Sequence, residues 1–284
     1  MPALGGAVAR YASRLGDAWI DWLRPAPKAA NDPEAAACFP LVPFSNRVRD
    51  GRFRFAGKQV VLSLDGLPGP HVEHGFGWRR PWTVATHTKD SATIEYRHDA
   101  GAWPFPFRAR QMFRLTAAAL AITIEIANAG AEAMPAGFGL HPYFPRTPAC
   151  RLEAQVAGMW SVDAEVMPVE LLTPPPADRD PGRGLAVDAV GLDNAFAGWS
   201  GRARIFWPER RAALTMEADA PLRFLVIYTP PGGSYFCAEP VSHCTDAFNL
   251  ADRGRADTGM IALAPGESAA AAVRFAPEIR KTES

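Results

Sequence analysis

Apolar and polar residues alternate with a period of two along much of this chain. In "ATIEYRH", Ile94 and Tyr96 fall on one face and polar or charged residues fall on the other. In "AITIEIAN", the apolar face is formed by Ile122, Ile124 and Ile126. Successive side chains of a strand point to opposite faces, so both segments predict half-buried antiparallel strands.

Further segments carry strand signals. "GRFRFAGKQVVLSLD", residues 51–65, predicts a hairpin that turns near Ala56–Gly57. The run Phe224–Tyr228 is apolar on both faces, which predicts a central strand covered on both sides. The same alternation recurs in "FRARQMFRLT", "RARIFWP", "ALTMEAD" and "AAAVRFAPE".

Many short strands with frequent turns predict an all-β fold, a large antiparallel β-sandwich or a barrel. No long segment has helical periodicity, and 24 Gly and 27 Pro residues punctuate the chain. The loop "TPPPADRDPGRG", residues 173–184, resembles a linker, but β periodicity continues on both sides of it. We therefore expect one domain over residues 1–284.

Composition limits the binding partners and the cellular compartment that we expect for this protein. Thirty basic and thirty acidic residues cancel, which gives no electrostatic reason to expect nucleic acid or an anionic membrane as a partner. The chain has no apolar run of about 18 residues, and its charged N-terminal segment lacks the apolar stretch of a signal peptide. Four scattered cysteines with no C-x-x-C pair suit a reducing cytoplasm.

Two Pro-flanked segments hold candidate acid–base residues. In "GLHPYF" and "FCAEPVSH", His141 and Glu239 each precede a proline, which restricts them to extended backbone. Alternation places Tyr235, Cys237 and Glu239 on one strand face, where partial burial would raise the pKa of the carboxyl toward the range of a general base. The alternatives are a half-buried His bonded to a carbonyl and a surface Glu in an ion pair.

A third segment, "HVEHGFGWRRPW", places His74 among glycines that allow a tight backbone path. Trp78 and Trp82 beside it would supply a flat apolar wall for the C–H face of a sugar. A loop histidine next to core aromatic residues explains the same pattern.

Two further polar residues stand near apolar segments. Asp193 in "VGLDNAFAGW" occupies what reads as a turn, and Asp is a common turn residue. Arg47 in "LVPFSNRVRDGRF" has the forked donors that suit sugar hydroxyls or carboxylates, although an Arg flanked by Arg49 and Arg52 also fits a solvated face.

Motifs of other enzyme classes are missing from the sequence. It has no G-x-S-x-G, P-loop, dinucleotide fingerprint or H-E-x-x-H. His74, His141 and His243 would have to meet in space to bind a metal, because no local ligand spacing supports such a site. We therefore expect neither a metal nor a cofactor.

Four segments together resemble the aldose 1-epimerases, or mutarotases. They are "PLVPFSNRVRDGRF", "HVEHGFGWRRPW", "GLHPYF" and "CAEPVSHCTDAFN", which follow the family's order over roughly residues 40–250, with "GLDNAFAGW" between the last two. The resemblance implies a large antiparallel β-sandwich, the galactose mutarotase-like supersandwich, that binds a hexose. It implies that a Glu takes the proton of the anomeric hydroxyl while a His protonates the ring oxygen.

The resemblance also assigns roles to residues. It implies that Glu239 is the base and His141 the proton donor, and that Arg47, His74 and Asp193 contact the sugar. His243, Cys244 and Asp246 are expected to support the loop after Glu239, where Pro240 would end the strand.

The sequence departs from the family at two places that shape the sugar site. Residues 73–76 read Glu-His-Gly-Phe where many mutarotases have Leu-His-Gly-Gly, and residues 140–142 read Leu-His-Pro instead of Asn-His-Ser. The expected substrate is a free hexose such as galactose or glucose. A hexose 6-phosphate is the alternative, because Arg47, Arg49, Arg79 or Arg80 would supply a cation.

Two other function classes stay open on this fold. One is a non-catalytic carbohydrate-binding protein. The other is a lyase or hydrolase that pairs Glu239 with Asp193, since most glycosidases need two carboxylates. No segment signals a specific protein interface, so a monomer or a homodimer is expected.

Overall fold

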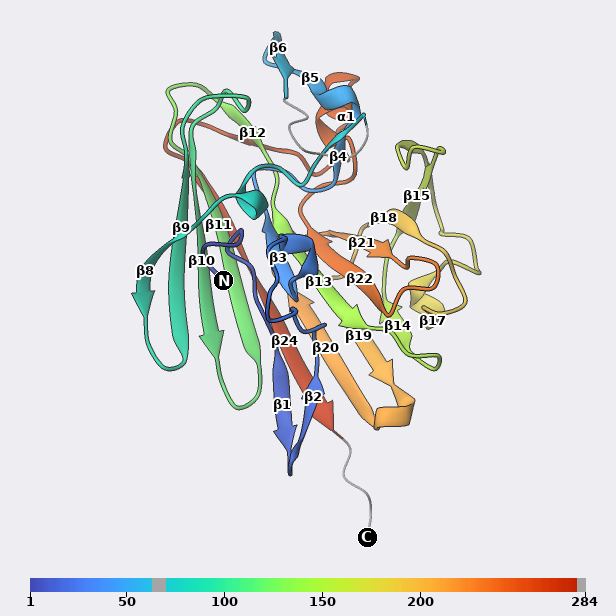
Figure 1. Cartoon of the computed structure of the whole chain (residues 1–284). Coiled ribbons are helices and arrows are strands. Elements are labelled where there is room, and N and C mark those ends of the chain that lie inside the picture. The colour runs from blue at the N-terminus through green and yellow to red at the C-terminus, as the bar shows by residue number, and fades with distance from the viewer. Residues whose placement is uncertain (63–69, 280–284) are drawn as a thin grey trace.

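The computed structural model describes residues 1–62 and 70–279 of the chain. Within them the fold is all-β, and two large antiparallel sheets dominate it (Figure 1). The expected large antiparallel β-sandwich is therefore confirmed. The last three residues of the hairpin segment 51–65 lie outside the described residues.

The larger sheet has nine strands among the described residues and contains most of the strongly alternating segments. In β11 (Leu120–Asn128), Ile122, Ile124 and Ile126 are fully buried, while the residues between them are partly exposed. The strand order is β17 (Leu185–Ala186), β14 (Arg151–Ala154), β19 (Arg202–Trp207), β20 (Ala212–Ala218), β24 (Ser268–Ile279), β11 (Leu120–Asn128), β10 (Phe107–Leu115), β9 (Ser91–His98) and β8 (Thr83–His87).

The second sheet has seven strands among the described residues, and its middle strand is β21. This strand is the run Phe224–Tyr228, so the prediction of a central strand is confirmed. The order is β16 (Pro168–Leu172), β15 (Gly158–Val162), β18 (Asp193–Ala197), β21 (Phe224–Tyr228), β22 (Tyr235–Val241), β13 (Gly139–Pro145) and β3 (Cys38–Leu41).

Short strand pairs and helical turns connect the sheets. The β5–β6 hairpin turns at Ala56 and Gly57, whose positive φ angles of 48° and 78° suit the tight hairpin expected there. The pairs are β1 (Ala12–Leu15) with β2 (Ala18–Asp21), β4 (Arg47–Val48) with β7 (Val72–Glu73), β5 (Arg52–Phe55) with β6 (Lys58–Val61), and β12 (Met134–Ala136) with β23 (Ile261–Leu263). The helical segments are η1 (Pro33–Ala35), η2 (Arg49–Gly51), η3 (Gly77–Arg79), η4 (Pro181–Arg183), η5 (Pro208–Arg210) and α1 (Ala247–Asp252).

The main hydrophobic core uses one face of the seven-stranded sheet. Leu225 and Ile227 of β21 and Ala238 of β22 join the same buried cluster as Ile122 and Ile124 of the larger sheet. The alternate residues of these strands point the other way, and they form a second, smaller cluster. The smaller cluster marks the outer face of the seven-stranded sheet, which remains available for a site.

Two local predictions are wrong. Asp193 does not lie in a turn, because it starts β18 and pairs with Tyr228 of β21. Pro240 does not end its strand, because β22 continues to Val241 and Pro240 pairs with Leu225. Pairing across the sheet outweighs the turn preference of Asp and the missing N–H of Pro.

In the described part of the chain, no helix has the length and apolar character that crossing a membrane requires. The four cysteines are all buried and free.

Candidate active site

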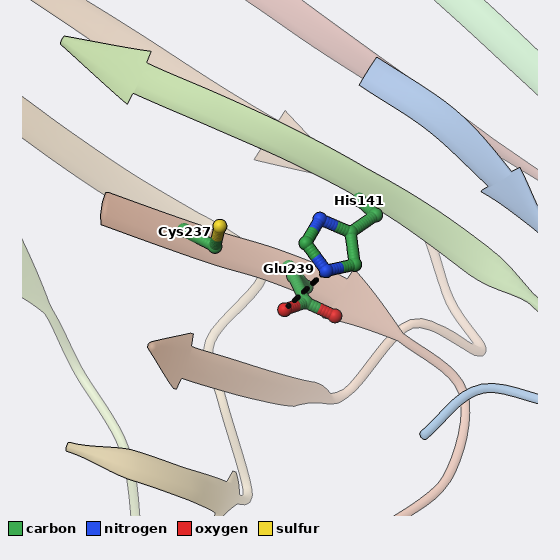
Figure 2. A group of neighbouring side chains, drawn as sticks. All are labelled: His141, Cys237 and Glu239. Carbon is green, nitrogen blue, oxygen red and sulfur yellow. Dashed lines mark ion pairs between the residues drawn. The ribbon is translucent and has the colours of Figure 1, made fainter. Parts of the chain in front are cut away.

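The register of the seven-stranded sheet brings the two acid–base candidates together. The β13–β22 ladder pairs Gly139 with Val241 and Tyr143 with Cys237. The same antiparallel register places His141 directly opposite Glu239, with both side chains on the outer face of the sheet. His141 Nε2 lies 3.3 Å from Glu239 Oε1 (Figure 2).

Prolines flank this pair on both strands. Pro142 follows His141 and Pro240 follows Glu239, and both lie between the two paired positions of the β13–β22 ladder. Neither proline has an N–H to donate, so the ladder is interrupted here while the side chains keep their alternation. The interruption occurs where the sheet carries its acid–base pair.

The short strands β4 and β7 place Arg47 on the same face of the sheet. Arg47 of β4 is paired with Glu73 of β7, and its Nε lies 2.6 Å from Glu73 Oε1. On its other side, Arg47 Nη1 donates to Asp193 Oδ2 at 3.3 Å. The arginine is therefore held between two carboxylates from different parts of the chain.

His74 is fixed by backbone contacts. Its N–H donates to the Asn46 carbonyl at 3.0 Å, and the Asn46 N–H donates to its Nδ1 at 3.1 Å. His74 adopts a positive φ of 61°, and Gly75 follows it at 70°. A Cβ on Gly75 would lie 2.2 Å from the Val42 carbonyl oxygen, so this tight path requires glycine, as the sequence predicted.

These residues line one pocket of about 200 Å³ on the outer face of the sheet. All five residues that the sequence singled out for catalysis or sugar binding line it, namely Arg47, His74, His141, Asp193 and Glu239. The pocket is completed by residues to which the sequence assigned no role in catalysis or sugar binding, among them Glu34, Phe39, Glu73, Tyr143, Tyr228 and Tyr235.

Burial sets the protonation of the central pair. The side chains of Glu239 and His141 are only 3% and 9% exposed. Burial raises the pKa of Glu239 well above its usual range, and the nearby Asp193 charge adds to the rise. Burial lowers the pKa of His141 well below its usual range.

Both shifts favour the neutral forms, a protonated Glu239 beside a neutral His141, so the pair holds one proton across a distance of 3.3 Å. Among the described residues, Glu239 Oε2 and His141 Nδ1 have no hydrogen-bond partner. One carboxyl and one imidazole therefore stand next to each other, able to accept and donate a proton at a bound molecule.

Aromatic rings hold the imidazole of His141 in place. Phe39 stacks on it with ring centroids 4.5 Å apart, and Tyr143 lies 4.7 Å from it. Trp78 is buried and stacks on Phe39 at 5.0 Å. Trp78 and Trp82 do not line the pocket, so the predicted tryptophan wall is wrong, and Phe39 with the tyrosines forms the apolar surface instead.

The other arginines named as phosphate candidates do not line this pocket. Arg49 pairs with Asp163 at 3.1 Å and with Glu165 at 3.5 Å. Arg79 lies over the Trp78 ring at 4.2 Å. The pocket itself contains one arginine and four carboxyl groups.

The residues after Glu239 support the loops around the pocket, as expected. His243 Nε2 accepts the Ser45 N–H at 3.1 Å, and its Nδ1 donates to the Cys244 carbonyl at 2.7 Å. Asp246 accepts the Arg49 N–H at 3.0 Å, and its own N–H donates to the Arg47 carbonyl at 2.9 Å. These bonds fix the segment that carries Arg47.

The metal triad considered from the sequence does not form, because His243 is held by these backbone groups. A different group has metal-ligand types. His141, Cys237 and Glu239 offer ligand atoms that lie within 4.8 Å of one another (Figure 2). The expectation that the protein needs no metal stays a prediction.

Some pocket residues were within reach of sequence reasoning. Tyr235 shares the strand face of Glu239, and Tyr143 lies two residues after His141, so alternation alone places both beside the acid–base pair. Glu73 had a weaker signal, as a departure from the family pattern next to His74. Glu34 lies in a helical turn and had no such signal.

The buried histidines predict a pH-dependent stability. Burial lowers the pKa of His74 to about 3 and that of His243 to about 4. Below about pH 6.5 the unfolded chain binds protons at these rings while the folded protein does not, so their contribution to stability is lost as the pH falls toward these values. His243→Gln is expected to reduce the slope of unfolding free energy against pH by up to about 1.4 kcal/mol per pH unit.

Urea unfolding at several pH values between 6.5 and 4 measures this slope. Burial raises the pKa of several carboxyl groups, and these groups increase the unfolding free energy as the pH falls. The prediction therefore concerns the difference in slope between each variant and the wild-type protein. The exposed His87 is the control, and the change of slope in His243→Gln should exceed that in His87→Gln. Equal slopes for His243→Gln and the wild-type protein would contradict the prediction.

Comparison with known proteins identifies the family. A model of the family described as aldose 1-epimerase matches residues 1–276. The uncharacterized protein YphB of Escherichia coli K12 is 37% identical over 254 residues, covering 87% of this chain and 85% of YphB.

The chain belongs to the aldose 1-epimerase family.

Solved structures of the family share the fold. A candidate aldose 1-epimerase from Escherichia coli K12 is 32% identical, with a TM-score of 0.87 over 98% of this chain and 94% of its own. A galactose mutarotase-like protein from Clostridium acetobutylicum is 21% identical, with a TM-score of 0.84 over 99% of this chain and 91% of its own. The second likeness concerns the fold alone, and it agrees with the two large antiparallel sheets.

Proposed function

We propose that this protein is an aldose 1-epimerase that interconverts the α and β anomers of an uncharged hexose such as galactose or glucose. The observation that carries the proposal is the buried His141–Glu239 pair, 3.3 Å apart in a pocket of about 200 Å³. Membership of the aldose 1-epimerase family supports the same reaction class.

The reaction needs one base and one acid. With the pair's single proton on His141, Glu239 as the carboxylate takes the proton of the C1 hydroxyl while His141 gives its proton to the ring oxygen, so the C1–O5 bond breaks and the free aldehyde forms. Rotation about the C1–C2 bond presents the other face of the aldehyde. Attack by the C5 hydroxyl then returns one proton to His141 while Glu239 protonates the new C1 hydroxyl. The cycle is balanced and needs no redox partner.

The remaining pocket residues would bind and orient the sugar. The guanidinium of Arg47 donates to sugar hydroxyls, and Asp193 accepts from them. Because Asn46 donates to Nδ1 of His74, a neutral His74 carries its proton on Nε2 and donates from there. Tyr228 and Tyr235, which line the pocket and are partly exposed, would contact the C–H groups of the ring.

The charge of the pocket favours a sugar without an anionic group. Glu34, Glu73 and Asp193 line it against a single lining arginine, Arg47, and Glu239 adds no positive charge. A phosphate would meet this excess of carboxyl groups, which disfavours a hexose 6-phosphate.

Optical rotation tests the proposal. Freshly dissolved α-D-galactose and α-D-glucose should reach their equilibrium rotation faster with the protein than without it. A protein that binds either sugar, seen by calorimetry, but leaves the rate unchanged would be a carbohydrate-binding module. Failure to accelerate any common aldose or hexose 6-phosphate would refute the epimerase proposal.

A further inference from the structure

Glu73 occupies one side of the arginine in the pocket. Its Oε1 lies 2.6 Å from Arg47 Nε, and its Oε2 lies 3.8 Å from His74 Nε2. Asp193 approaches Nη1 of the same guanidinium at 3.3 Å. Two of the three nitrogens of Arg47 therefore face carboxylates that belong to the protein.

The backbone makes this arrangement a built feature of the pocket. Arg47 and Glu73 are direct partners in the β4–β7 ladder, and the adjacent His74 and Asn46 are joined by two hydrogen bonds. The side chains of Arg47 and Glu73 are 21% and 30% exposed, so their charges are only partly screened by solvent. Glu73 thus reaches the pocket by the register of two strands.

The electrostatic consequence concerns the substrate. An arginine without carboxylate partners attracts phosphate and carboxylate groups through its fork of donors. Arg47 is instead flanked by two carboxylates, and the local sum of charges around it is negative when both are ionised. It can still donate to a neutral hydroxyl, which carries no net charge to be repelled.

We propose that Glu73 is a specificity-determining residue, which neutralises Arg47 and restricts the pocket to uncharged aldoses by excluding phosphorylated and carboxylated ones. This inference rests on the proposed epimerase function and goes beyond it by assigning the selectivity to one side chain.

The test compares a neutral and an anionic substrate in the wild-type protein and in Glu73→Gln. Anomer exchange of glucose and of glucose 6-phosphate, followed by NMR, gives kcat/KM for each. Wild-type protein should prefer glucose. Glu73→Gln keeps the size of the side chain and an oxygen acceptor toward Arg47 but removes the charge, so the ratio should shift toward glucose 6-phosphate by at least about tenfold.

Glu34→Gln is the matched control. Glu34 lines the same pocket, and its side chain is 58% exposed and lies 3.8 Å from Arg79. Its removal subtracts the same charge without changing a partner of Arg47, so the substrate ratio should change by a clearly smaller factor. An equal shift in Glu34→Gln would mean that overall pocket charge, and not Glu73, sets the selectivity, and would overturn the assignment.

Salt provides a second measurement that does not depend on a variant. Raising the ionic strength should improve kcat/KM for glucose 6-phosphate relative to glucose in the wild-type protein, because screening weakens repulsion of the phosphate. A wild-type preference for glucose 6-phosphate, or an unchanged ratio in a folded Glu73→Gln, would overturn the inference while leaving the epimerase activity established. Absence of activity on every aldose would instead refute the proposed function itself.

Discussion

Glu239→Gln is expected to lower kcat for mutarotation by about 10²- to 10⁴-fold, the usual contribution of a positioned general base. The amide has nearly the shape of the carboxyl but cannot accept the proton of the anomeric hydroxyl. The fall should appear equally in kcat and kcat/KM, because proton transfer occurs in the transition state. Optical rotation of α-D-galactose, corrected for the spontaneous rate, measures the loss.

The same variant should remain folded. Glu239 is buried, and burial raises the pKa of its carboxyl because it disfavours the charged form. A neutral amide avoids that cost, so the urea midpoint of Glu239→Gln should equal or exceed the wild-type value. Glu165→Gln, which changes a half-exposed carboxyl outside the pocket, is the control for activity. Wild-type turnover in a folded Glu239→Gln would exclude Glu239 as the base.

His141→Asn is expected to lower kcat by a similar factor of about 10² to 10⁴ while KM changes by no more than a few-fold. The imidazole donates its proton to the ring oxygen as the C1–O5 bond breaks, so its main contribution is to the transition state. Asparagine keeps a polar amide beside Glu239 but cannot release a proton. Initial rates over a range of galactose concentrations separate kcat from KM.

A structural role for His141 predicts a different pattern. The ring packs between Phe39 and Tyr143, so a histidine that only supported this aromatic surface would change KM and stability more than kcat. His87→Asn, on the exposed strand β8, is the matched control and should leave both constants unchanged. A large rise in KM with unchanged kcat in His141→Asn would contradict the proton-donor role.

Local sequence signals located most of the fold. Alternation identified β9, β10 and β11, and the apolar run Phe224–Tyr228 identified the middle of the second sheet. These signals were reliable because each strand buries one face or both, and the buried positions must be apolar. Turn chemistry was less reliable, as the strand positions of Asp193 and Pro240 show.

Local signals found only part of the pocket. The motifs placed Arg47, His74, His141, Asp193 and Glu239, all of which line it. They marked Glu73 only as a departure from the family, and they did not show its contact with Arg47, which the β4–β7 pairing sets. They also assigned the apolar wall to Trp78, which lies behind Phe39. Both contacts depend on the tertiary structure. Strand register decides which residue lies beside Arg47, and the packing of Phe39 decides whether Trp78 reaches the pocket.

The sequence by itself determined the all-β class, the family and the five polar residues, because alternation and short motifs are written in consecutive positions. Only the tertiary structure decided which side chains meet. It set His141 opposite Glu239 through the β13–β22 register, and it enclosed Arg47 between Glu73 and Asp193. The physical reason is that protonation and charge recognition act over a few ångströms of space, while these residues are far apart along the chain.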